Sequence, residues 1–131
     1  MTTEPLWLSK QAVVVLHDRS IGIHGGAPGL RDEGLLESAL DRPANRFHYE
    51  GVDDICDLAA TYLVAIASNH PFADGNKRAA FLAAGLFLRR NGRRLVAAQA
   101  DAARTVLAVA AGDRDIEKLA AWIRRVSILD D

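Results

Sequence analysis

The stretch His70-Pro71-Phe72-Ala73-Asp74-Gly75-Asn76-Lys77-Arg78 joins two strongly hydrophobic segments and decides how the rest of the chain is interpreted. Before it, residues 54–69 place apolar side chains at helical spacing, and one further turn of that stripe leads to His70. Pro71 lacks an N–H and disfavours helical geometry in the residue before it, so the first helix is expected to end there. After it, the uncharged run AAFLAAGLFL predicts a buried helix over 76–91.

The first turn of this second helix carries two cations, Lys77 and Arg78, at the end where the helix dipole disfavours positive charge. We therefore expect an anion there. A helix start preceded by a glycine turn offers free N–H groups to phosphate, and Gly75 would let the backbone come close. Asn76 could add donors, and arginine can bind phosphate oxygens in bidentate fashion.

Two further side chains of the stretch bring other chemistry. Asp74 is a hard oxygen ligand suited to the Mg²⁺ that accompanies a nucleoside triphosphate. His70 is a natural base for a hydroxyl group, since histidine is the side chain that most often serves as a general base. The sequence thus predicts His70 as catalytic residue, Asp74 as metal ligand and residues 75–78 as the phosphate site. A solvated turn is the plainer interpretation, and residue types alone leave both open.

Helical periodicity and capping residues predict four more helices. We expect a first from the Ser9 cap to Ile21 or Ile23 and a second from Asp32 to near Arg42-Pro43, and the others run from about Asp101 to Ala111 and from Asp115 to about Val126. Residues 43–53 are expected to form a loop with Phe47 and Tyr49 against the domain, no strand is expected, and the last five residues look frayed. The predicted fold is an all-α, single-domain bundle of about six helices spanning 1–131, with the motif loop between two central helices.

Composition limits the classes of function. A net charge of −1 argues against a general nucleic-acid binder, so any phosphate affinity must be local. The single Cys56 excludes an internal disulfide and fits a reducing compartment. We find no signal peptide, and the longest apolar run, 79–88, is half of the roughly 20 residues that a membrane span needs. The protein is therefore expected in the cytoplasm, without membrane contact.

Other constellations point to no second site. The four histidines lack the spacing of zinc ligands. His24-Gly25-Gly26-Ala27-Pro28-Gly29 lacks the G-x-G-x-x-G order and is better explained as a helix end followed by a turn. His17-Asp18-Arg19 is interpreted as a solvated, charged face late in the first helix.

The run from His70 to Arg78 resembles the signature of the Fic/Doc superfamily, H-x-F-x-(D/E)-(G/A)-N-(G/K)-R. Within it the chain is similar to the Doc (death-on-curing) toxins rather than to the larger Fic adenylyltransferases. Lys77 stands where Fic enzymes have glycine, and Phe81 stands where they place a second arginine. The similarity to Doc extends over almost the whole length and includes H-D-R (17–19), H-G-G-A-P-G (24–29), R-D-E-G-L-L-E-S-A-L (31–40), T-Y-L-V-A (61–65) and L-F-L-R-R-N-G (86–92).

This resemblance implies the toxin of a type II toxin–antitoxin system. It implies transfer of the γ-phosphate of ATP, with Mg²⁺, to a threonine of elongation factor Tu, which arrests translation. It also implies a cognate antitoxin whose disordered C-terminal part folds as a helix on the toxin, and it suggests that Arg19 or His24 lines the cleft. Two alternatives stay open: AMP transfer of the Fic type, against which Phe81 argues, and an inactive module that only binds the antitoxin.

Overall fold

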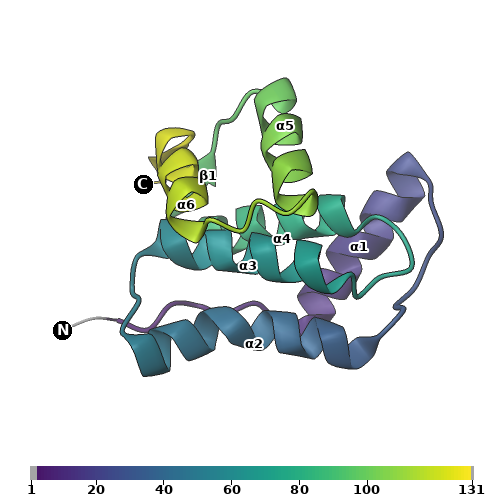
Figure 1. Ribbon diagram of the computed structural model, residues 1–131, viewed down its shortest axis with the longest axis horizontal. Helices are drawn as coiled ribbons and strands as arrows, with labels where there is room; N and C mark the ends of the chain where they lie inside the picture. The colour runs from purple at the N-terminus through teal and green to yellow at the C-terminus, as the bar shows by residue number, and fades with distance from the viewer. Residues whose placement is uncertain (1–2, 131) are drawn as a thin grey trace.

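The computed structural model describes residues 3–130, which form six helices and one small antiparallel sheet (Figure 1). In chain order the elements are α1 (Lys10–His24), α2 (Glu33–Glu50), α3 (Ile55–Asn69), α4 (Asn76–Arg90), β1 (Arg93–Leu95), α5 (Gln99–Ala110), α6 (Ile116–Arg125) and β2 (Ser127–Leu129). The all-α fold is confirmed, with the sheet as an addition.

Helix α3 is the centre of the molecule. It packs against α2 on one side and against α5 and α6 on the opposite side, and α4 lies beside it (Figure 1). Every residue from Leu58 to Ala67 is consequently buried. Helix α1 packs against α4, which brings it next to the loop 70–75 that joins the two central helices.

Side-chain caps fix where four of the helices begin, namely α1, α2, α3 and α6, and the starts at Ser9, Asp32 and Asp115 agree with the prediction. The capping oxygens belong to Ser9, Asp32, Asp54 and Asp115, and each accepts a hydrogen bond from a backbone N–H of the first turn. Helix α4 is different, because Gly75 precedes it and offers no side chain to its first-turn N–H groups.

The predicted end of the second helix at Pro43 is wrong, because α2 continues to Glu50 and ends at Gly51. A proline inside a helix costs about 3 kcal/mol, and contacts made beyond it offset that cost. Arg46 binds the carboxylate of Asp57 on α3, and Phe47 packs edge-on against Trp7 with 5.7 Å between ring centroids. The expected loop over 43–53 is therefore mostly helix. Tyr49, expected against the domain, is 84% exposed.

The expectation of no strand is also wrong. β1 pairs with β2 with Arg94 opposite Ile128, so residues 127–129, expected to be frayed, are held in a sheet. Hydrogen bonds from Val96 N to Val126 O (2.6 Å) and from Asp130 N to Gly92 O (2.8 Å) extend the pairing. Strands of three residues are too short to produce a visible alternation of hydrophobicity.

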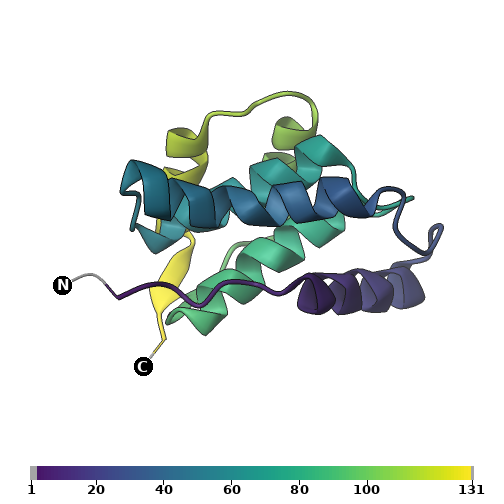
Figure 2. The same cartoon turned by 90° about the horizontal axis from the view of Figure 1, so that it is seen from below.

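The N-terminal segment runs in extended form along the helices before α1 begins (Figure 2). The side chain of Asn91 bonds both the N–H and the carbonyl of Leu6, at 2.8 and 3.1 Å. The N–H of Leu8 donates to the hydroxyl of buried Tyr62 at 3.1 Å. These bonds tie the start of the chain to the end of α4 and the middle of α3. Among residues 3–130, no helix combines the length and the hydropathy needed to cross a bilayer.

Candidate active site

The loop between α3 and α4 begins at His70, which caps α3 in the left-handed conformation (φ 49°, ψ 56°). Within residues 3–130 it is the only non-glycine residue with positive φ. Histidine tolerates this conformation better than most residues do. The side chain of His70 is exposed. The backbone carbonyl of His70 accepts a hydrogen bond from Arg31 Nε at 2.8 Å.

The loop is paired with the segment that leads into α2. Ala73 N donates to Gly29 O at 3.1 Å, and the N–H groups of Arg31 and Asp32 donate to Pro71 O at 2.7 and 3.0 Å. Arg31 Nη2 also donates to the carbonyl of Asn69 at 3.2 Å. Sequence reasoning gave Arg31 no part in the site, because these bonds use backbone carbonyls and leave no residue pattern.

Asn76 closes the loop on itself. Its Oδ1 accepts from Phe72 N at 2.9 Å, and its Nδ2 donates to Phe72 O at 3.0 Å. The side chain is thereby occupied with loop structure, so the predicted contribution of Asn76 to a phosphate site rests on its backbone N–H.

His17 of α1 contacts the loop from the interior of the protein, through its ring and through a hydrogen bond. Its ring is fully buried and stacks on Phe72, with 3.8 Å between centroids and 8° between planes. Its Nε2 donates to the carbonyl of Asp74 at 2.7 Å. The interpretation of residues 17–19 as a solvated face is wrong for His17. The burial could have been inferred from spacing, since Val13, His17 and Ser20 fall on one helical face.

The carboxylate of Asp74 lies between the loop and the glycine-rich segment after α1. It accepts from Gly75 N at 2.8 Å and from Ala27 N at 3.4 Å, and it remains exposed. Gly26 passes so close that a Cβ there would lie 2.7 Å from Asp74 Oδ2, and its φ of +115° also requires glycine. The turn over 25–29 therefore shapes the surroundings of Asp74, which the motif alone does not reveal.

The N-terminus of α4 presents unsatisfied donors and positive charge. In the described chain no acceptor pairs with the backbone N–H groups of residues 76–78. Arg78 Nη2 donates to Gly25 O at 3.2 Å, which holds the guanidinium at this end, and Lys77 is exposed without a carboxylate partner in residues 3–130. Such an end favours an anion, phosphate above all.

Asp74 is the acidic side chain of the loop, and no cluster of three or more His, Cys, Asp or Glu that could hold a metal occurs in the described part of the chain. A dedicated all-protein metal cage is therefore absent from residues 3–130. Mg²⁺ in nucleotide sites is commonly held by one or two carboxylates together with phosphate oxygens. Asp74 beside a phosphate-ready helix start fits that arrangement.

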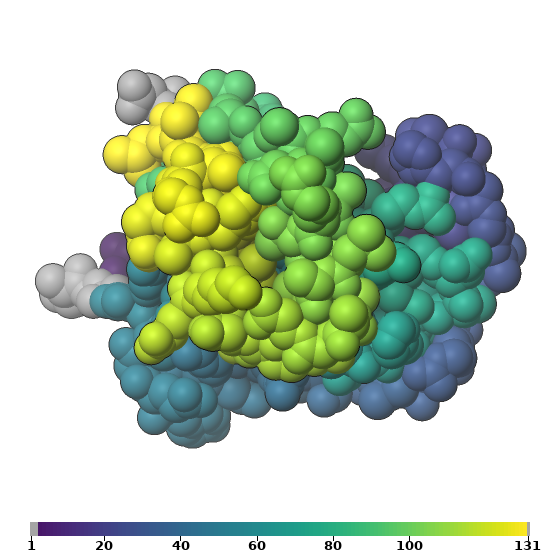
Figure 3. Space-filling model, turned by 45° about the horizontal axis from the view of Figure 1, so that its top comes forward, coloured from purple at the N-terminus to yellow at the C-terminus, as the bar shows by residue number. Residues whose placement is uncertain are grey.

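A groove of about 440 Å³ opens next to this end of α4, bounded by α1, α4 and α5. Figure 3 shows the surface hollowed between the green atoms of α5 and the purple atoms of α1. The groove is mostly apolar, and its lining residues are Ser20, His24, Lys77, Arg78, Phe81, Leu82, Gln99, Ala102, Ala103, Val106 and Leu107. His24 lines this groove, whereas Arg19 is exposed and does not, and a role of either residue toward nucleotide or target stays a prediction.

Comparisons with known proteins agree on one family. The sequence model of the Fic/DOC family matches residues 7–88. The chain is 40% identical over 119 residues to "Protein kinase doc" of Escherichia phage P1, an alignment that covers 91% of this chain and 94% of the relative. It is also 40% identical over 100 residues to "Toxin Doc" of Mycolicibacterium smegmatis (strain ATCC 700084 / mc(2)155), covering 74% of this chain and 77% of the relative.

Proposed function

The chain belongs to the Fic/DOC family, and from this premise we propose that it is a Doc-type toxin that phosphorylates a threonine of elongation factor Tu. The phosphate donor is ATP with Mg²⁺, and the reaction takes place in the cytoplasm. The observation that carries this proposal is the uncapped N-terminus of α4, where free N–H groups, Lys77 and Arg78 meet next to Asp74.

Residues of the loop and of the first turn of α4 share the work of the proposed reaction. The N–H groups of residues 76–78, with Lys77 and Arg78, bind the phosphates of ATP. Asp74 holds Mg²⁺, which neutralises charge on the phosphate oxygens when it is bound. His70 accepts the proton of the threonine hydroxyl as its oxygen bonds to the γ-phosphorus, while the bond to the leaving ADP breaks.

Two positions favour phosphate over AMP as the transferred group. Phe81 lines the groove beside Arg78, in the place where Fic enzymes have a second arginine, and an aromatic ring offers no donor to a phosphate. Lys77 adds a cation at the start of α4, where Fic enzymes have glycine. We infer that the terminal phosphate, not the α-phosphate, lies at the reaction centre.

The groove between α1, α4 and α5 is the proposed docking site of the antitoxin helix. Its apolar lining suits the apolar face of an amphipathic helix. Ser20 Oγ is buried at its wall without a hydrogen-bond partner in the described chain, so an acceptor on the antitoxin would satisfy it. Lys77, Arg78 and His24 at one end favour acidic residues on the helix, and a helix bound there would cover part of the phosphate site.

The test is transfer of label from ATP to purified elongation factor Tu, with γ-labelled and α-labelled ATP compared and the added mass measured. Phosphotransfer predicts γ-label alone and a phosphate-sized mass on threonine, and none of it with His70→Ala. Retention of α-label with an AMP-sized mass would replace the kinase assignment by adenylyl transfer. Absence of both labels would refute the proposed substrate.

A further inference from the structure

A second groove, of about 560 Å³, is lined by residues of α2 and α3 together with Arg114 and Ile116. Sites for small ligands usually measure about 300–1,000 Å³, so it is large enough to hold one. None of its lining residues lines the groove at α1, α4 and α5. The proposed phosphotransfer reaction does not use this second groove.

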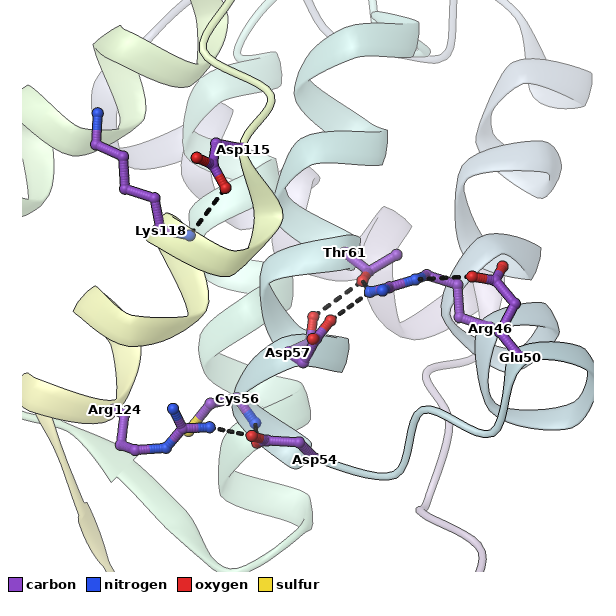
Figure 4. Close-up of polar contacts among 9 residues, drawn as sticks. All are labelled: Arg46, Glu50, Asp54, Cys56, Asp57, Thr61, Asp115, Lys118 and Arg124. Atoms are coloured by element: carbon purple, nitrogen blue, oxygen red, sulfur yellow. Dashed lines mark hydrogen bonds and ion pairs between the residues drawn. The ribbon is translucent and has the colours of Figure 1, made fainter.

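Three arginines reach this groove, and one of them is already neutralised. Arg46 binds the carboxylate of Asp57, donates to Thr61 Oγ1 at 2.8 Å and lies 3.9 Å from Glu50, as Figure 4 shows. Its charge is therefore met within the protein by two carboxylates.

The other two arginines, Arg42 and Arg114, are exposed and have no ion-pair partner among the described residues. The carboxylates next to Arg114 are engaged elsewhere. Asp113 binds Lys118 Nζ at 2.8 Å, and Asp115 accepts from Lys118 N at the start of α6 (Figure 4). The groove thus carries two uncompensated guanidinium groups, each with several donors arranged to bind phosphate oxygens.

The rest of the lining offers hydrogen bonds and a small apolar surface. The side chain of Asn45, which lines the groove, makes no hydrogen bond within residues 3–130. Asn69 donates through Nδ2 to Leu35 O at 2.9 Å, which leaves its Oδ1 as an acceptor, and Ser68 Oγ keeps lone pairs after donating to Val64 O at 2.6 Å. Val64 and Ile116 add the apolar part. Cations, amides and an apolar floor together suit a phosphate joined to a larger, partly polar group.

We propose that this groove binds a phosphorylated small molecule of nucleotide size, with its phosphate on Arg42 and Arg114. Ser68 and Asn69 form the last turn of α3, directly before His70, and Asn69 is bonded to both α2 and Arg31. A ligand in the groove therefore contacts the turn that presents His70. Given the phosphotransfer function proposed above, such a ligand would regulate it.

The experiment measures binding by calorimetry in the full chain carrying Lys77→Ala and Arg78→Ala, which removes the proposed ATP site. The probes are AMP and inorganic pyrophosphate, without Mg²⁺. We expect AMP to bind in a one-to-one ratio and at least tenfold more tightly than pyrophosphate. Equal affinity for the two probes would show a simple anion site and overturn the nucleotide-size assignment.

Adding Arg42→Gln and Arg114→Gln should weaken AMP binding by more than tenfold. The matched control is Arg89→Gln with Arg90→Gln, which removes the same charge from exposed arginines at the far end of α4 and should change binding less than twofold. Circular dichroism checks that all variants are folded. Absence of AMP binding, or equal losses in the two double variants, would overturn the proposal, and neither result bears on label transfer from ATP.

Discussion

His70 joins two requirements in one residue, an exposed imidazole and a left-handed backbone at the end of α3. His70→Asn keeps a residue that favours this backbone, whereas His70→Ala adds strain of about 1 kcal/mol. Both remove the proposed base, so transfer should fall by roughly 10²-fold or more. The melting temperature of His70→Asn should stay within a few degrees of the wild type. Full transfer activity in His70→Asn, measured with labelled ATP, would show that the base is another group.

His17 acts on the loop through two separable contacts, a stacked ring and a hydrogen bond. His17→Phe keeps a ring against Phe72 but leaves the Asp74 carbonyl without its donor, a loss of about 1–3 kcal/mol. His17→Gln keeps an amide donor and loses the stacking. If the bond positions Asp74, the affinity for Mg-ATP should fall more in His17→Phe than in His17→Gln.

His48→Phe is the control for this pair, because His48 is an exposed histidine on α2. It should leave Mg-ATP affinity unchanged. Equal affinities in His17→Phe and the wild type would mean that His17 contributes packing alone.

At the scale of single elements, the start of α4 leads to the most specific prediction. Arg78 donates to Gly25 O and is proposed to bind phosphate in bidentate fashion. Arg78→Lys should therefore weaken Mg-ATP binding even though the charge is kept, because an ammonium group cannot bind in this way. Asp74→Ala should weaken it in Mg²⁺ but not in EDTA. Calorimetry of both variants against the wild type decides the matter, and unchanged Mg-ATP affinity in both would remove these two residues from the site.

Element positions could be predicted where the signal is local. Ser9, Asp32, Asp54 and Asp115 cap helices that the sequence already indicated, because capping involves neighbours in the chain. The continuation of α2 past Pro43 could not be predicted, because Asp57 and Trp7, which hold its last turns, are brought there by the fold.

The same division applies to the candidate site. The nine residues from His70 to Arg78 are predicted from their motif and lie together in the loop 70–75 and the first turn of α4, and their proposed chemical roles stay predictions. His17, Gly26 and Arg31 were missed, because each acts on a backbone carbonyl or on the space around Asp74. The residue types in a sequence indicate the chemistry of the side chains. They do not show which residues the fold brings into contact, and these three contacts depend on that.

Across the whole molecule, the burial of Tyr62 in the core should be visible in the pH dependence of stability. Burial raises the pKa of Tyr62 to about 12, from an ordinary value near 10. The folded state therefore holds this proton more tightly than the unfolded state, so its contribution is fully present below about pH 10 and is lost as the pH rises to about 12.

Denaturant unfolding at intervals from pH 8 to pH 12 measures this loss, which should amount to roughly 2–3 kcal/mol at most. Tyr62→Phe should be less stable at pH 8, because Leu8 N loses its acceptor, and should show a flatter decline above pH 10. Parallel declines in the two proteins would assign the alkaline loss to other groups.

The packing of α6 on α3 has a consequence for how the protein is made. Residues up to Arg90 contain the whole candidate active site, yet they cannot bury the side of α3 that α6 covers. We infer that a nascent chain at that stage exposes apolar surface on the helix that presents His70, and we expect the loop to become fully ordered only once α6 has packed on α3. If the chain is a translation-blocking toxin as proposed, a chain that ends before α6 should be inert, and the toxin should not act before its own synthesis is complete.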